Sequence, residues 1–293
     1  MKKATGFLKR HSLVIGIVLM FALTWPIDLA NSGILPFKVP FMIYLTLGYG
    51  FIYASLLMTG LTLGKEGVVA LLKRFLLWRV GWKWYLALLI MPSLTVMGVL
   101  LNAALTQTPI DFSTAYAYRI FGSSANLWFF VIPFFLVDAL ANGEEIGWRG
   151  YVLPRLQARH SALTSALLLG IVWAFWHLPK FLPHWNTVTF AWYILDTLAK
   201  SVFLAWMYNN TKGSLLLVTL GHAMWNTAGV FLPTATTAAN GNNGAFIITV
   251  MLGVLVMAVI IVIAGPERLS RTESMQTQAS ASPVPGPIVP SVS

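Results

Sequence analysis

The sequence predicts an all-α fold, a polytopic transmembrane helical bundle with about eight spans and both termini in the cytoplasm. Of its 293 residues, 57% are hydrophobic and 10% are charged, whereas soluble domains have roughly 45–50% and 25%. The apolar residues gather in runs of about 20, the length that crosses a ~30 Å hydrocarbon core as a helix. The runs cover residues 13–35, 41–63, 84–105, 127–146, 162–182, 188–208, 214–233 and 245–264.

Basic residues precede the first run, as they do in a secretory signal peptide. The run is long, however, and it lacks a convincing small-residue cleavage site, so we interpret it as a span. Between the second and third runs, residues 65–83 mix Lys and Arg with Leu, Phe and Trp. This mixture is typical of a helix lying at the membrane interface. It fits a plain basic connector as well as a segment that guides substrate.

The distribution of cations predicts the orientation of the bundle. With the N-terminus inside, 15 Lys and Arg residues fall on the cytoplasmic side and only Lys38, Arg119 and Lys180 fall outside. An excess of this kind marks the cytoplasmic loops of membrane proteins. Because the cations lie between apolar runs, the net charge of +10 indicates orientation within a lipid bilayer and gives no support for nucleic acid as a partner.

Composition also bounds the domain organisation and the chemistry. Residues 1–269 read as one membrane-embedded helical domain without internal repeats, and residues 270–293 as a disordered tail rich in polar residues and proline. The chain has no cysteine, which excludes disulfides, thiolate metal sites and cysteine nucleophiles.

Five acidic residues fall in or beside the apolar runs, where a charge costs roughly 2.5–3.5 kcal/mol on insertion scales. They are Asp28, Asp138, Glu144, Glu145 and Asp196. The densest cluster follows the fourth run. On a helix, Glu145 would share one face with Asp138, Asn142 and Arg149 and could pair with Arg149, while the adjacent Glu144 would be turned about 100° away.

This cluster has two readings. The carboxylates could carry different roles, with Gly143 and Gly147 letting a neighbouring helix approach closely. Alternatively, they form a buried ion-pair network that only fixes helix packing. His177 ends the fifth run, and His222 lies four residues before Asn226 on the seventh. Alone, His177 reads as a packing histidine, and His222 with Asn226 as a simple hydrogen-bonded pair.

Taken in order, the motifs Glu144-Glu145-x-x-x-Arg149, an aromatic residue four positions before His177, and His222-x-x-x-Asn226 form a pattern. It resembles the CAAX protease and bacteriocin-processing enzyme family of intramembrane peptidases, which is related to the CAAX prenyl endoprotease. The resemblance covers roughly residues 125–230, which would be the catalytic core. The chain departs from the family at Trp173, where Phe is usual.

The resemblance implies an endopeptidase that hydrolyses a peptide bond in a membrane-associated protein or peptide. Glu144 and His177 would activate water, and His222 and Asn226 would stabilise the oxyanion. Glu145 and Arg149 would support the site. Family members are often labelled metalloproteases, and Glu144, His177 and His222 could hold a divalent metal such as zinc through two imidazoles and one carboxylate.

Two other functions remain open on the sequence. Asp28, Asp138, Asp196 and Lys200 could relay protons or cations in a carrier, although carriers often show duplicated halves and this chain does not. A catalytically silent membrane scaffold is the other alternative. The short loops predict a bacterial plasma membrane as the location. The substrate, whether prenylated or bacteriocin-like, is not predicted by the sequence.

Overall fold

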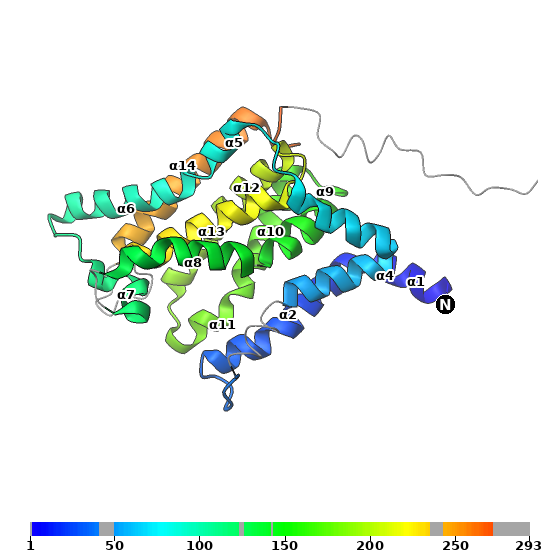
Figure 1. Ribbon diagram of the computed structural model, residues 1–293, viewed down its shortest axis with the longest axis horizontal. Coiled ribbons are helices and arrows are strands. Elements are labelled where there is room, and N and C mark those ends of the chain that lie inside the picture. Colours follow the sequence, from blue (N-terminus) through cyan, green and yellow to red (C-terminus); the bar gives the residue numbers. More distant parts are fainter. Residues whose placement is uncertain (1, 41–49, 123–125, 142, 235–242, 272–293) are drawn as a thin grey trace, which may run out of the picture.

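The computed structural model describes residues 2–40, 50–122, 126–141, 143–234 and 243–271. In these residues the chain is helical without strands (Figure 1), so the all-α bundle is confirmed. The main helices are α1 (Lys2–Arg10), α2 (Ser12–Asn31), α4 (Gly50–Lys73), α5 (Trp82–Ala87), α6 (Ile90–Thr106), α7 (Tyr116–Phe121), α8 (Leu127–Ala141), α9 (Leu153–Gln157), α10 (Ala162–Trp176), α11 (Leu178–Phe181), α12 (Thr187–Asn210), α13 (Leu215–Phe231) and α14 (Gly244–Ala264). A π-helix, η4 (Ile146–Val152), lies between α8 and α9.

Helix α12 lies at the centre of the bundle. It packs against α10, α13 and α14, while α13 also contacts α8 and α6. Figure 1 shows α8, α10, α12 and α13 side by side, with α6 and α14 at one flank and α2 and α4 at the other. Consecutive residues Val202, Phe203, Leu204 and Ala205 of α12 are all buried. Four consecutive positions point to all sides of a helix, so this part of α12 is surrounded by other helices, as expected at the centre of a bundle.

The eight predicted segments all contain helix in their described parts, but they are not eight equal spans. Six helical segments of the described chain are long and apolar enough to cross a membrane. The segment with α10 and α11 bends by 46° after Trp176, where Pro179 opens the next helix. Helix α13 has 17 residues, fewer than the ~20 of a full span, and Pro233 follows its end.

The segment after α14 is hydrogen-bonded to α10 and α12 at one end of the bundle. The backbone oxygens of Pro266 and Glu267 accept the first amides of α10, from Leu163 and Ala162. The Ser270 hydroxyl donates to Asn210 Oδ1 at 2.9 Å, at the end of α12. Ser270 therefore packs on the helical domain, while residues 272–293 of the predicted tail lie outside the described residues, as do 41–49 of the second predicted span.

The cytoplasmic placement of both termini remains a prediction that single cysteines can test, because the chain has none of its own. Cysteines replacing Thr108 and Trp185 should react with a membrane-impermeant maleimide added outside intact cells. Cysteines replacing Arg159 and Arg271 should react only after the membrane is opened. The reverse pattern at two or more of these four exposed positions would contradict the orientation.

Candidate active site

The segment with the two adjacent glutamates joins α8 to η4 through a turn at Gly143. Close packing of α4 against this segment depends on its glycines. A Cβ on Gly147 would lie 2.9 Å from the Phe51 ring, and one on Gly143 would lie 2.3 Å from Ile52. The predicted close approach of a neighbouring helix is confirmed. The π-helical turn itself was not predicted, and such turns occur frequently at functional sites.

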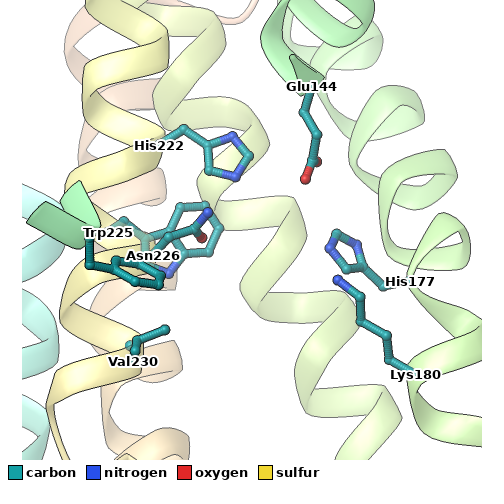
Figure 2. Close-up of a pocket in the computed structure, with 9 residues that line it drawn as sticks. Glu144, His177, Lys180, His222, Trp225, Asn226 and Val230 are labelled. Atoms are coloured by element: carbon teal, nitrogen blue, oxygen red, sulfur yellow. The ribbon is translucent and has the colours of Figure 1, made fainter. Parts of the chain in front are cut away.

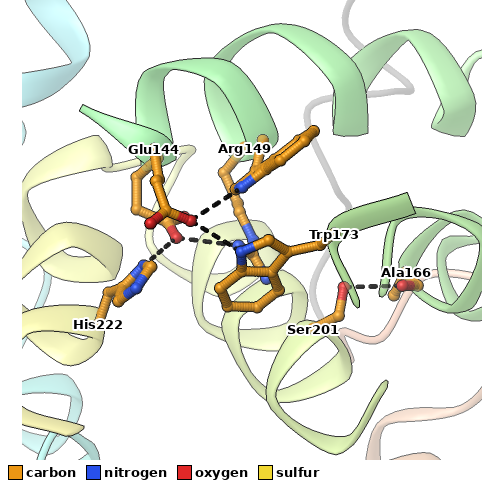
Figure 3. Close-up of polar contacts among 8 residues, drawn as sticks. Glu144, Arg149, Ala166, Trp173, Ser201 and His222 are labelled. Carbon is orange, nitrogen blue, oxygen red and sulfur yellow. Dashed lines mark hydrogen bonds and ion pairs between the residues drawn. The ribbon is translucent and has the colours of Figure 1, made fainter. Parts of the chain in front are cut away.

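Glu144 receives two indole donors at the same carboxylate oxygen. Trp173 Nε1 donates to Glu144 Oε2 at 2.7 Å, and Trp148 Nε1 donates to the same atom at 3.2 Å. Figure 3 shows the bond that Trp173 of α10 makes with Glu144. The carboxylate is thus held by one helix of the bundle and by its own turn.

Glu145 points to a different set of partners, as the predicted 100° offset requires. Arg149 Nη1 donates to Glu145 Oε1 at 2.9 Å, and both side chains are fully buried, which confirms the predicted pair. His222 Nδ1 lies 2.8 Å from the same oxygen, a contact between η4 and α13 that the sequence did not predict. Since an ionised carboxylate only accepts, Nδ1 is the protonated nitrogen facing it.

Asn226 makes a second polar connection of α13, this time to α8. Its Nδ2 donates to Asp138 Oδ2 of α8 at 3.1 Å, so the amide nitrogen and not its oxygen faces the carboxylate. Asp138 of the predicted shared helix face thus contacts α13 through Asn226, as Glu145 does through His222. Asn142, also assigned to that face, lies outside the described residues.

His177 caps α10 at the bend before α11. Its Nδ1 lies 3.0 Å from the carbonyl oxygen of Trp173, and a carbonyl can only accept. Nδ1 is therefore the donor, and in the neutral ring Nε2 keeps its lone pair. The ring is held by edge contacts with Trp176 and Tyr193, whose centroids lie 4.6 and 5.4 Å away.

The four predicted catalytic residues line one cavity of about 310 Å³. Figure 2 shows Glu144 and His177 on one side of it, with His222 and Asn226 across from them on α13. Its lining residues are Phe134, Glu144, His177, Lys180, His222, Trp225, Asn226, Gly229 and Val230. A ring of polar groups with an apolar end is typical of a ligand site.

The two residues predicted to support the site do not line the cavity, and two other residues near the site were not predicted. Glu145 and Arg149 lie behind the cavity, where the Arg149 guanidinium stacks 4.7 Å from the Trp173 ring. Lys180, three residues after His177, lines the cavity and was missed as a site residue. Trp148, four residues after Glu144, was also missed, although helical spacing could have indicated it.

The proposed metal ligands are not gathered into a coordination set. Among the described residues, no group of three or more His, Cys, Asp or Glu side chains lies close enough to hold a metal ion. Glu144 Oε2 is already taken by two indole donors. As placed, Glu144, His177 and His222 do not fit a zinc site.

Comparison with known proteins bears on the same part of the chain. Residues 123–228 match the family described as Rce1-like, type II CAAX prenyl endopeptidase. A protein from Methanococcus maripaludis named CAAX prenyl protease 2 is 28% identical over 150 residues, which cover 47% of this chain and 52% of that protein. The chain thus spans about half the length of this relative. The resemblance that the three motifs indicated is confirmed.

Replacing Glu145 by Gln should lower thermal stability strongly. The change removes the charge beside buried Arg149, and an unpaired buried cation can cost about 3–5 kcal/mol. Melting in detergent would measure it, with Glu66→Gln as the control because Glu66 is exposed on α4. Equal melting of Glu145→Gln and Glu66→Gln would contradict a stabilising role for the Glu145–Arg149 pair.

Proposed function

We propose that this chain, whose residues 123–228 belong to the Rce1-like family of CAAX prenyl endopeptidases, is an intramembrane endopeptidase. The observation that carries the proposal is that Glu144, His177, His222 and Asn226 all line one cavity. Glu144 comes from the turn before η4, His177 from the bend after α10, and His222 and Asn226 from α13. They supply the base and the donors that peptide hydrolysis needs.

Glu144 and His177 activate the water. The Glu144 carboxylate and the lone pair at His177 Nε2 are both proton acceptors on one side of the cavity. A water between them loses a proton as its oxygen attacks the peptide carbonyl carbon. The same proton then passes to the departing amine, so no serine or cysteine nucleophile is needed. General-base catalysis of this kind contributes roughly 10²–10⁴-fold to rate.

His222 and Asn226 face the developing oxyanion. Asn226 has a second N–H besides the one that Asp138 takes. Donation from both His222 Nε2 and His222 Nδ1, the latter to Glu145, requires the imidazolium form of the ring. Oxyanion donors of this kind are worth about 2.7–4 kcal/mol each where they have been removed. Glu145 and Asp138 thereby orient the two donors without touching the substrate.

The substrate that we propose is a membrane-associated protein or peptide. The relative's name denotes a prenyl protease, so a prenylated peptide with a CAAX carboxyl terminus is the first substrate to test. The location that we propose is the plasma membrane of a bacterium, in agreement with the short loops. A carrier is less well supported, because Asp138 is bonded to Asn226 and Asp196 pairs with Lys200 of its own helix at 2.5 Å.

Glu144→Gln should lower cleavage of a fluorogenic prenylated CAAX peptide by at least 10²-fold, since the amide keeps the shape but cannot accept the proton. The variant should also melt at a higher temperature than Glu145→Gln. The assay uses purified protein in liposomes, with ion flux measured in parallel. Wild-type cleavage by Glu144→Gln, or flux without cleavage in the wild type, would reject the proposal.

Because the candidate ligands are not assembled, we expect cleavage to persist after chelation and the purified protein to hold no stoichiometric zinc. Elemental analysis of wild type beside His177→Ala measures this. A stoichiometric metal that is lost in His177→Ala would contradict the expectation and would assign Glu144, His177 and His222 as ligands. A metal retained in the variant would place its site elsewhere.

A further inference from the structure

Two tryptophans hold the proposed base. An indole N–H is a donor with no acceptor capacity, so Trp173 and Trp148 can only donate to Glu144 Oε2. The bond from Trp173 is the shorter, at 2.7 Å against 3.2 Å from Trp148. Because both donors meet one oxygen, the two bonds fix the direction in which the Glu144 carboxylate points.

Trp173 is itself fixed from several sides. Its side chain is 2% exposed. The Arg149 guanidinium lies 4.7 Å from the ring. The rings of His222 and Trp225 meet it edge-on, with centroids 5.3 and 5.8 Å away. The indole cannot turn from Glu144 without disturbing Arg149 or His222, so its N–H is a preorganised donor.

We propose that Trp173, assisted by Trp148, is a positioning residue that holds the Glu144 carboxylate in its reactive orientation. This inference rests on the proposed function, in which Glu144 is the base. Phe, the usual residue at position 173 in the family that the motifs resemble, has no N–H to offer. In this chain the aromatic position four residues before His177 thus takes a polar role in addition to packing.

A purely structural Trp173 would fill space between α10 and α13 and would affect the fold more than the chemistry. Trp173→Phe separates the two roles, because it keeps a ring at the position and removes the donor. If positioning is its role, kcat should fall roughly 10- to 100-fold, the loss expected for one hydrogen bond to a charged group. KM should stay within about twofold, since the indole does not touch substrate.

Trp148→Phe should lower kcat less than Trp173→Phe does, because the hydrogen bond from Trp148 to Glu144 is the longer of the two. Trp206→Phe is the matched control. Trp206 packs on Trp84, with ring centroids 4.8 Å apart, and it is not among the residues that line the cavity. If wild type cleaves, Glu144→Gln does not, and Trp173→Phe keeps the wild-type kcat, then the positioning role is wrong while the proposed function stands.

The bond can also be tested without a substrate. In protein labelled with ¹⁵N at the indoles, the Trp173 Nε1–H resonance is identified by its loss in Trp173→Phe. In Glu144→Gln this resonance should move upfield, because a neutral amide accepts more weakly than a carboxylate. The Trp206 resonance should not move. An unchanged Trp173 resonance in Glu144→Gln would overturn the inference, whatever the activity assays show.

Discussion

Glu145 connects the π-helical turn to α13, because one carboxylate oxygen meets both Arg149 and His222. A buried carboxylate in a membrane protein is costly unless it is paired, and these two partners provide the pairing. Asp138 of α8 and Asn226 make a second connection to α13, four residues after His222. The two connections fix where His222 and Asn226 face the cavity. In the proposed mechanism, the geometry of the oxyanion donors therefore depends on these two carboxylates.

The site is built from the least regular helices of the bundle. Glu144 precedes a π-helix, His177 lies at the bend between α10 and α11, and His222 is on the 17-residue α13. Backbone that departs from the α-helix is tolerated at membrane depth only where protein or a water-filled cavity surrounds it. Ser214 begins α13 by accepting the Leu217 amide while it donates to Leu77. Irregular backbone and buried polar groups thus occur together.

The spacing of residues in the sequence predicted contacts within one helix, whereas contacts between helices depend on how the helices pack. The bundle followed from apolar runs, and the Glu145–Arg149 pair followed from a separation of four residues. The contacts of Glu145 with His222 and of Glu144 with Trp173 span 77 and 29 residues, and no helical period indicates them. The π-helix was not predictable from hydropathy, because an extra residue in one turn leaves composition unchanged. Nor did helical spacing indicate that Asp138 would contact Asn226 of α13, 88 residues away.

The difference between the two adjacent glutamates lies in the charge of their donors. Trp148 and Trp173 offer Glu144 neutral N–H groups, which orient the carboxylate without cancelling its charge. Arg149 offers Glu145 a full positive charge in a buried setting, where attraction between ions is strong. The buried ion pair suits Glu145 to a structural role. In the proposed mechanism, one residue step along the chain thus separates the base from the residue that supports the site.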